Sequence, residues 1–285
     1  MSKFIGYASG IAAGDIGCKD GPDYLFKTHK FKNTKILYDF FDINHTDKYA
    51  VVKDICTRLS DEIVQCIQQE KFFTVIGGDH SCAIGTWSGA AHVLRDKGDI
   101  GLIWIDAHLD AHTPQTSPSG NIHGMPVAVL LGHGDERLIH IQDNLPKIKP
   151  ENICMIGMRS YESGEQDLIN KLNIKVFYIE EVLKRGFDEV FAEAREIVTR
   201  NTIGYGLSLD IDGIDPIEAP GVGTPAENGI SGEIIYQGFK KYYVQDKKSK
   251  KNKKLLGVEF AEFNPHRDID KKTEILIIKL LEVFS

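Results

Sequence analysis

The sequence predicts an α/β fold, a three-layer sandwich in which an eight-stranded, mainly parallel sheet has helices on both faces. Short apolar runs rich in β-branched and aromatic residues recur between longer segments of helical length, which is typical of a sheet covered by helices. The apolar runs are continuous rather than alternating, as expected for strands buried on both faces. At 285 residues the chain is long enough to bury a large core.

Eight strands are expected from these runs. In chain order they are Phe4–Tyr7, Lys35–Phe40, Phe72–Ile76, Ile100–Ile105, Ile153–Ile156, Lys175–Ile179, Ile203–Leu209 and Leu255–Phe260. Helical length and apolar spacing predict helices between most of them and after the last. The expected helices are Val51–Gln69, Gly85–Asp96, Gly124–Leu131, Val182–Arg200, Gly232–Val244 and Lys271–Phe284. No linker rich in Pro, Gly or Ser interrupts the chain, so a single domain over residues 1–285 is expected.

Composition and charge exclude several classes of protein. The net charge of -7 argues against nucleic acid as a partner, because phosphate binding needs a basic face. The five cysteines are an odd number without a C-x-x-C pair, which indicates reduced thiols in a cytoplasmic protein. No apolar stretch has the length of a membrane span and no signal-peptide pattern is present, so neither membrane insertion nor export by that route is expected.

A run of lysines at positions 247–254 is a candidate basic patch. It falls between an expected helix and an expected strand, and charge runs most often stay in water. A solvated loop is therefore preferred to a nucleic-acid surface.

Acids and histidines follow four of the expected strands at their carboxyl ends, which is the edge where parallel sheets bind ligands. His80 follows the third strand, Asp106, His108 and Asp110 follow the fourth, Asp210 and Asp212 follow the seventh, and Glu262 follows the eighth. Because these strands belong to one sheet, the side chains are expected to meet at one crevice.

The six residues at the ends of the third, fourth and seventh strands form a candidate metal site. They are His80, Asp106, His108, Asp110, Asp210 and Asp212. Four carboxylates in one crevice would raise each other's pKa and repel unless cations balance them, and two divalent ions would do so. Oxygen ligands with some imidazole favour a hard metal such as Mn²⁺. Each residue alone could cap a turn or pack in the core, but the Asp-x-His-x-Asp and Asp-x-Asp patterns together favour metal.

The segments that carry these ligands resemble the three signature segments of the ureohydrolases, the arginase and agmatinase superfamily. They are Gly77–His80, Asp106–Asp110 and Ser208–Pro216. The similarity begins near Gly17–Pro22 and runs past Glu262–Pro265, so it spans nearly the whole chain. It implies a three-layer α/β fold, a binuclear manganese site that Co²⁺ or Ni²⁺ could also occupy, and a homo-oligomer, commonly a trimer or hexamer.

The resemblance also implies a role for each ligand. His80 and Asp110 would bind one metal, His108 and Asp212 the other, and Asp106 and Asp210 would bridge both. The metals would share a hydroxide, because two cations lower the pKa of one water. That hydroxide would attack the guanidinium carbon, and the metals with Asp110 would stabilise the intermediate as it collapses to urea and an amine.

Three further residues match functional positions of the family. Glu262 matches the acid that holds the guanidinium, or is a surface acid before a turn. His123 matches the histidine that carries a proton to the leaving amine, or is a loop histidine bonded to backbone. Thr224 matches a pocket position, or is a plain turn residue.

The loop from His112 to His123 distinguishes among family members. It is similar to the loop that binds the α-carboxylate of arginine, and Ser117, Ser119 and Asn121 supply neutral donors for it. Agmatine has no carboxylate. The resemblance therefore favours hydrolysis of L-arginine to L-ornithine and urea.

Two departures leave other substrates open. His112 stands where arginine-hydrolysing members carry an asparagine donor, although its ring could still donate. The segment Gly157–Glu162 lacks the aspartates that surround the α-amino group, and its Arg-Ser pair resembles agmatinase-like members. Glu162 or Glu165 could supply the missing charge. The alternatives are agmatinase, guanidinobutyrase or another guanidino-acid hydrolase, and formiminoglutamase.

A different class is a non-catalytic metal-binding relative, or a binuclear hydrolase of amides or phosphates. The presence of every ligand counts against an inactive relative. A phosphatase needs Arg or Lys near the metals, and Arg159 is the only nearby candidate.

Overall fold

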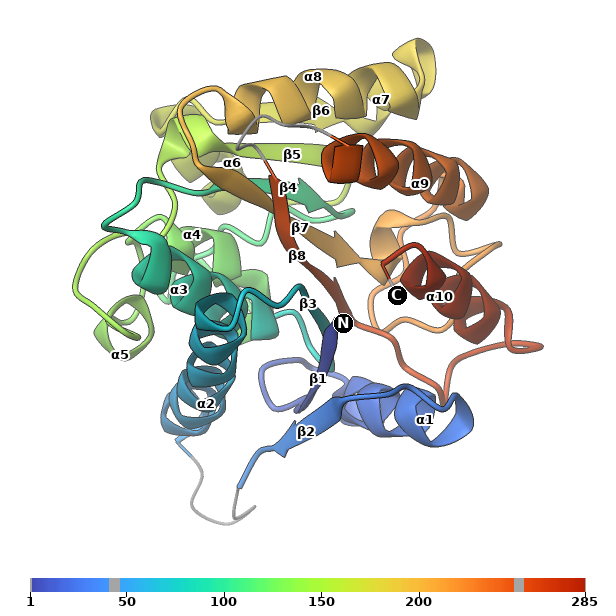
Figure 1. Ribbon diagram of the computed structural model, residues 1–285, viewed down its shortest axis with the longest axis horizontal. Coiled ribbons are helices and arrows are strands. Elements are labelled where there is room, and N and C mark those ends of the chain that lie inside the picture. The colour runs from blue at the N-terminus through green and yellow to red at the C-terminus, as the bar shows by residue number, and fades with distance from the viewer. Residues whose placement is uncertain (1, 41–46, 249–253, 285) are drawn as a thin grey trace.

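The computed structural model describes residues 2–40, 47–248 and 254–284. One sheet of eight parallel strands runs through it in the order β2-β1-β3-β8-β7-β4-β5-β6 (Figure 1). The strands are β1 Lys3–Ala8, β2 Thr34–Tyr38, β3 Phe73–Gly77, β4 Gly101–Ile105, β5 Ile153–Met158, β6 Lys175–Tyr178, β7 Gly204–Asp210 and β8 Lys254–Ala261. All eight expected strands and the α/β fold class are thus confirmed.

Helices cover both faces of the sheet. They are α1 Gly21–Thr28, α2 Lys48–Gln68, α3 Cys82–Leu94, α4 Pro126–Leu130, α5 Glu136–Ile139, α6 Ser163–Lys171, α7 Ile179–Arg185, α8 Phe187–Thr199, α9 Gly232–Lys248 and α10 Lys272–Glu282. Helices α2 to α6 pack in one hydrophobic cluster, and α1 with α7 to α10 packs in the other. Within the described ranges, no helix has both the length and the apolar character that crossing a bilayer requires.

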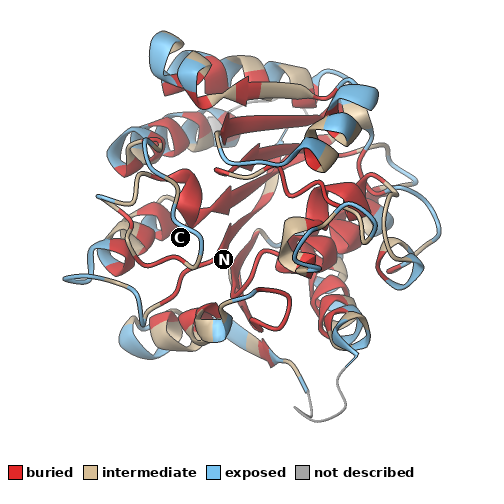
Figure 2. Cartoon of the chain, turned by 180° about the vertical axis from the view of Figure 1, so that it is seen from behind, coloured by how far each residue is buried: buried red, intermediate tan, exposed pale blue. Residues whose placement is uncertain are grey.

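Strand residues alternate between the two clusters. In β4, Leu102 and Trp104 belong to one cluster while Ile103 and Ile105 belong to the other, because successive side chains of a strand point to opposite faces. Figure 2 shows that the central strands are buried along their length, as are the inner faces of the helices. Burial on both faces is why these strands are continuously apolar.

The expected single helix over Val182–Arg200 is wrong. The structure has two helices there, α7 and α8, separated by Gly186 with φ +86°. That left-handed backbone is readily adopted only by glycine and cannot continue a right-handed helix. Three helices, α1, α5 and α6, were not expected, since they have only 8, 4 and 9 residues and show too few turns of apolar spacing.

The lysine run is not simply the expected loop. Lys247 and Lys248 belong to the end of α9, and Lys254 opens β8. Lys250, Lys251 and Lys253 lie outside the described residues.

Strand order places the four functionally marked strands side by side. β3, β8, β7 and β4 are consecutive in the middle of the sheet, and being parallel they end at one edge. Gly78, which follows β3, contacts the ends of two other strands: its N–H donates to the carbonyl of Tyr7 in β1 (2.7 Å), and its carbonyl accepts from the N–H of Glu262 after β8 (2.7 Å). A Cβ on Gly78 would lie 2.0 Å from the Ser9 carbonyl oxygen, so only glycine allows this close approach.

Gly206 in β7 should tolerate no side chain. A Cβ there would lie 2.0 Å from the buried ring of Trp87, and overpacking of this kind costs about 1–3 kcal/mol. Gly206→Ala should lower the free energy of unfolding by about that amount, measured by urea unfolding. Gly223→Ala is the matched control, because its Cβ would have no neighbour nearer than 3.8 Å. Equal stability of the two variants would contradict the prediction.

Candidate active site

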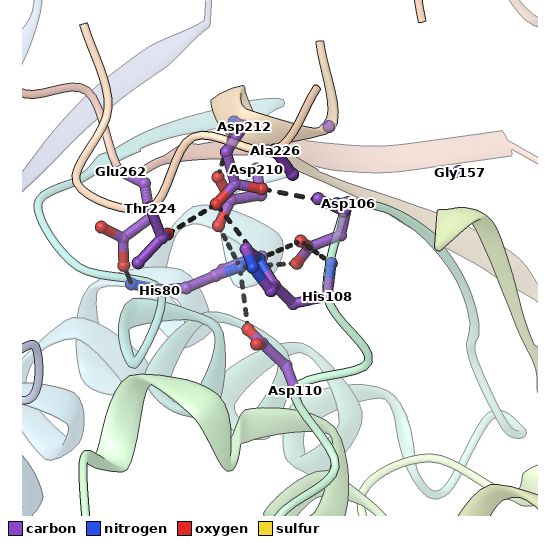
Figure 3. A network of polar contacts seen from close by, with 12 residues as sticks. His80, Asp106, His108, Asp110, Gly157, Asp210, Asp212, Thr224, Ala226 and Glu262 are labelled. Atoms are coloured by element: carbon purple, nitrogen blue, oxygen red, sulfur yellow. Dashed lines mark hydrogen bonds and ion pairs between the residues drawn. The ribbon is translucent and has the colours of Figure 1, made fainter. Parts of the chain in front are cut away.

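The His80 ring lies among three carboxylates at the carboxyl edge of the sheet. Its Nδ1 is 3.3 Å from Asp106 Oδ2, 3.2 Å from Asp110 Oδ2 and 3.0 Å from Asp210 Oδ2. Figure 3 shows these side chains pointing toward one another from the ends of different strands. All four residues are buried.

His108 forms a second group with two carboxylates. Its Nδ1 is 3.2 Å from Asp212 Oδ2 and 3.5 Å from Asp106 Oδ1. Asp106 therefore belongs to both groups, one oxygen toward each histidine. Asp210 also joins the two halves, since its Oδ1 accepts from the Asp212 N–H at 2.9 Å.

The donor set fits two divalent cations. Buried His80 Nδ1 has no hydrogen-bond partner within the described chain, although it lies near three carboxylates. A buried polar atom without a partner is costly. An imidazole nitrogen with carboxylate oxygens is a suitable set of ligands for a hard or borderline divalent metal. The two groups around His80 and His108 are the places where such ions would be held.

The pKa shifts show that negative charge is in excess here. Burial, reinforced by Asp212 and Asp106, raises the pKa of Asp210 well above its ordinary value. Burial and the Asp106 charge raise the pKa of Asp110 to about 6. Burial would lower the pKa of His80, but its carboxylate neighbours raise it well above the usual range. Bound cations would relieve this repulsion.

Two of the expected functional residues have backbones in the left-handed region. Asp110 has φ +48° and Glu262 has φ +69°. Residues other than glycine rarely adopt this conformation, and it persists where the surroundings hold it in place. For Glu262 the holding contacts are its N–H on the Gly78 carbonyl and its carboxylate on the His80 N–H at 2.9 Å.

His123 and Glu262 form a buried pair. His123 Nδ1 is 2.9 Å from Glu262 Oε1. Burial would lower the pKa of His123, but Glu262 raises it to about 9. Glu262 is 2% exposed, and its partner His123 lines the pocket whereas Glu262 does not. The structure thus places Glu262 behind His123.

A pocket of about 310 Å³ opens beside the carboxylates. Its lining includes metal-site candidates and the loop expected to bind a carboxylate: His108, Asp110, Asp210, Asp212, Ser117, Ser119 and Asn121. His112, His123, Glu162, Glu165 and Thr224 line it as well. The Thr224 hydroxyl donates to Asp212 Oδ2 at 2.9 Å. The residues expected to bind the substrate therefore line one cavity, except Glu262, the acid expected to hold the guanidinium, which lies outside its lining.

The two positions that depart from the family pattern contact each other. His112 Nε2 lies 2.6 Å from Glu162 Oε2 and 3.5 Å from Glu165 Oε2. His112 and Glu165 are buried, whereas the Glu162 side chain is 62% exposed. Burial is the main cause that raises the pKa of Glu165, to about 7.

Arg159 is bound to backbone carbonyls. Its guanidinium donates to the carbonyls of Gly157, Asp212, Gly213, Ala226 and Glu227 at 2.7–3.3 Å. It therefore holds the loops behind the site together. This use leaves little support for the phosphatase alternative, which needs a cation facing the pocket.

Four residues that contact the site or lie next to it were not predicted from the sequence, namely Ser208, Glu259, Trp104 and Asp79. Ser208 contacts His80 Nε2 at 2.9 Å and donates to Glu259 at 2.8 Å. The Trp104 ring stacks on His80 with centroids 4.2 Å apart, and its Nε1–H donates to Asp106 Oδ2 at 2.9 Å. Asp79 accepts from the Ala12 N–H at 3.1 Å. A signal was available for Glu259 and Ser208, because both interrupt apolar strands at buried positions.

Comparisons with known proteins agree with this geometry. The model of the arginase family matches residues 3–284. The arginase of Bacillus subtilis (strain 168) is 41% identical over 225 residues, which is 79% of this chain and 72% of that protein. A crystal structure of Bacillus subtilis arginase superposes with a TM-score of 0.86 at 35% identity, covering 99% of this chain and 96% of the other. The Entamoeba histolytica arginase complex with L-ornithine has a TM-score of 0.86 at 30% identity, covering 99% and 97%.

Loss of the Trp104 N–H should weaken metal binding. Trp104→Phe keeps a ring against His80 but removes the donor to Asp106, and losing such a supporting contact typically lowers metal affinity about 10–100-fold. Metal per subunit after dialysis against a chelator measures the effect. Trp87→Phe is the matched control, since the buried Trp87 Nε1 has no partner in the described chain. Equal metal retention by both variants would refute the role given to Trp104.

Proposed function

The chain belongs to the arginase family, and on that premise we propose that it hydrolyses L-arginine to L-ornithine and urea. Family membership makes it a metal-dependent hydrolase with a binuclear metal centre that acts on a small guanidino substrate. One observation carries the choice of arginine: the hydroxyl- and amide-bearing loop of Ser117, Ser119 and Asn121 lines the same cavity as Asp110 and His108. The 41% identity to the Bacillus subtilis arginase supports the same substrate.

The metal ligands proposed are the six residues of the carboxyl edge. His80 and Asp110 serve one ion, His108 and Asp212 the other, and Asp106 and Asp210 both. Mn²⁺ is the proposed metal, because carboxylates outnumber imidazoles, and Co²⁺ or Ni²⁺ could use the same ligands. When bound, the two ions supply a nucleophile by lowering the pKa of water toward neutrality.

The loop and the pocket wall orient the amino-acid end of the substrate. Ser117, Ser119 and Asn121 offer neutral donors to an α-carboxylate. Glu162 and Glu165 offer negative charge to an α-ammonium. Fixing this end places the guanidinium at the metal ligands, and such positioning is a large part of the barrier reduction available to this reaction.

His123 and Glu262 are proposed to act at the guanidinium end of the substrate. Paired with Glu262, the His123 imidazole keeps its proton up to about pH 9, so it has a proton to give to the leaving amine throughout the neutral range. Oε1 of Glu262 holds His123 and the His80 N–H. A substrate guanidinium is also a planar cation with N–H donors, so the same carboxylate can accept from it beside the imidazolium.

Other substrates stand as alternatives. Agmatine, 4-guanidinobutyrate and other guanidino acids share the reacting group, and formiminoglutamate shares the chemistry. The contact of His112 with Glu162 is the observation that favours them, because the His112 ring competes with the α-amino group of arginine for this carboxylate.

We propose one domain over residues 1–285, since a single family model matches residues 3–284. A homo-oligomer, a trimer or hexamer, is proposed from the family resemblance. The five buried cysteines, none of which is in a disulfide within the described chain, support a cytoplasmic location.

The Mn²⁺-loaded enzyme should prefer arginine. Its kcat/KM for L-arginine should exceed that for agmatine about a hundredfold or more, because agmatine leaves the carboxylate donors unpaired. Urea release from arginine, agmatine and 4-guanidinobutyrate, and formamide release from formiminoglutamate, test this. Asn121→Ala should lower the ratio of kcat/KM for arginine to kcat/KM for agmatine. A higher kcat/KM for agmatine than for arginine would refute arginine as the substrate. If the metal-loaded protein turned over none of these substrates, the ureohydrolase function itself would be refuted.

Glu262 should set the titration of His123. In the metal-free protein the His123 ring should titrate near pH 9. In Glu262→Gln only burial and weaker charges act on it, so its midpoint should fall toward or below about 6.5. Two-dimensional NMR of histidine-labelled protein measures the midpoint. Glu165→Gln is the matched control: it removes another pocket carboxyl that does not contact His123, and should leave the midpoint near 9. An unchanged midpoint in Glu262→Gln would contradict the pairing.

A further inference from the structure

One loop of the pocket wall has few contacts with the rest of the protein. We call residues 223–228 the wall loop. It contains neither helix nor strand, and none of its six residues is buried. Thr224 lines the pocket beside the carboxylates, and residues 225–228 line a second hollow of about 580 Å³. Because open space lies beside both parts of the wall loop, its position depends on hydrogen bonds more than on packing.

The guanidinium of Arg159 holds the wall loop by two backbone carbonyls. Its Nη2 donates to the Ala226 carbonyl at 2.9 Å, and its Nε donates to the Glu227 carbonyl at 3.0 Å. The Thr224 hydroxyl adds a third bond, to Asp212 Oδ2 (Figure 3). Within residues 2–40, 47–248 and 254–284, these three are the only hydrogen bonds between the wall loop and other segments.

The same guanidinium holds the turn that carries Asp212. Its Nη2 also donates to the Asp212 carbonyl at 2.7 Å, and its Nη1 donates to the carbonyls of Gly157 at 3.1 Å and Gly213 at 3.3 Å. A guanidinium has five N–H donors in a fixed planar arrangement, and here they meet five carbonyls. Arg159 thus spends its whole donor set on joining the wall loop to the turn of a metal-site residue.

The turn has further bonds that do not depend on Arg159. The Asp212 N–H donates to Asp210 Oδ1 at 2.9 Å, and the Gly213 carbonyl accepts from the Ile230 N–H at 3.1 Å. Loss of the guanidinium should therefore free the wall loop and leave the metal-site residues in place.

We propose that Arg159 is a positioning residue for the substrate pocket, because it keeps the wall loop, and with it Thr224, against the Asp212 turn. The proposal rests on the proposed function in one respect, since it takes arginine to be the molecule that the pocket binds. A wall that is already in place spares the cost of ordering the loop when the substrate binds. Arg159 therefore acts on substrate affinity and not on the reacting atoms.

Arg159→Lys is the first test. Lysine keeps the positive charge but has one nitrogen in place of three, so it cannot hold both the turn and the wall loop. In the Mn²⁺-loaded variant the KM for arginine should rise about tenfold, because binding must then order the loop, while kcat and manganese per subunit should stay at the wild-type values. Arg159→Gln serves as a second variant if the lysine form does not fold.

Arg185→Lys is the matched control. The Arg185 guanidinium is bonded to the side chains of Glu181, Glu189 and Glu193 and holds no carbonyl of the wall loop. This variant loses the same fork of donors at another place, and it should keep the wild-type KM.

A second measurement does not depend on turnover. A glutamate-specific protease should cut after the exposed Glu227 faster in Arg159→Lys than in the wild type or in Arg185→Lys, because cleavage needs local opening of the loop. Mass spectrometry of the fragments identifies this cut. If the cut is faster but no form of the protein hydrolyses arginine, the proposed function is refuted and the anchoring of the wall loop stands.

A double variant tests whether Arg159 acts through the wall loop. Effects on KM should not accumulate in Arg159→Lys/Thr224→Ala, because the contact of Thr224 is already lost once the loop is free. Independent sites would instead multiply their effects.

Three results would overturn the proposal. Cleavage after Glu227 at the wild-type rate in Arg159→Lys would mean that other contacts hold the wall loop. Loss of manganese from this variant would mean that Arg159 supports the metal ligands instead. Multiplied effects on KM in the double variant would mean that Arg159 and Thr224 act separately.

Discussion

Repulsion between buried carboxylates is the constraint on which the site depends. The fold brings Asp106, Asp110, Asp210 and Asp212 together at one edge of the sheet, where all four are buried. Such charges are costly to bury unless cations accompany them. The rest of the structure serves to keep them in place: an apolar sheet buried on both faces beneath them, and backbone hydrogen bonds between the strand ends.

The strands and the meeting of the metal-site residues could be predicted from the sequence, because the patterns that mark them are local. A continuous apolar run marks a buried strand within a few residues, and all eight strands were found this way. Since parallel strands end at one edge, residues such as His80 and Asp210 could be expected to meet without knowing the order of the strands. The family resemblance added the roles, which spacing alone does not supply.

The features that the sequence did not predict depend on backbone angles and on contacts between distant parts of the chain. Apolar spacing continues across Gly186, so the break between α7 and α8 is visible only in its backbone angle. Arg159 looked like a cation available to a ligand, but carbonyls brought in by other loops occupy it. His112 and Glu162 are 50 positions apart. Taken alone, each is a single difference from the family pattern, and only the structure shows that the two side chains contact each other in the pocket.

The position of β8 has a consequence for how the protein is made. It is the last strand along the chain, yet it lies between β3 and β7 in the middle of the sheet (Figure 1). Glu262 follows it and bonds to the His80 N–H across 182 positions. During synthesis the chain therefore has two unfilled strand edges until its final part emerges, and such edges invite wrong pairing. Insertion of β8 joins the two parts of the sheet and at the same time completes the surroundings of His80. Stability and activity should therefore both appear only once this last strand is in place.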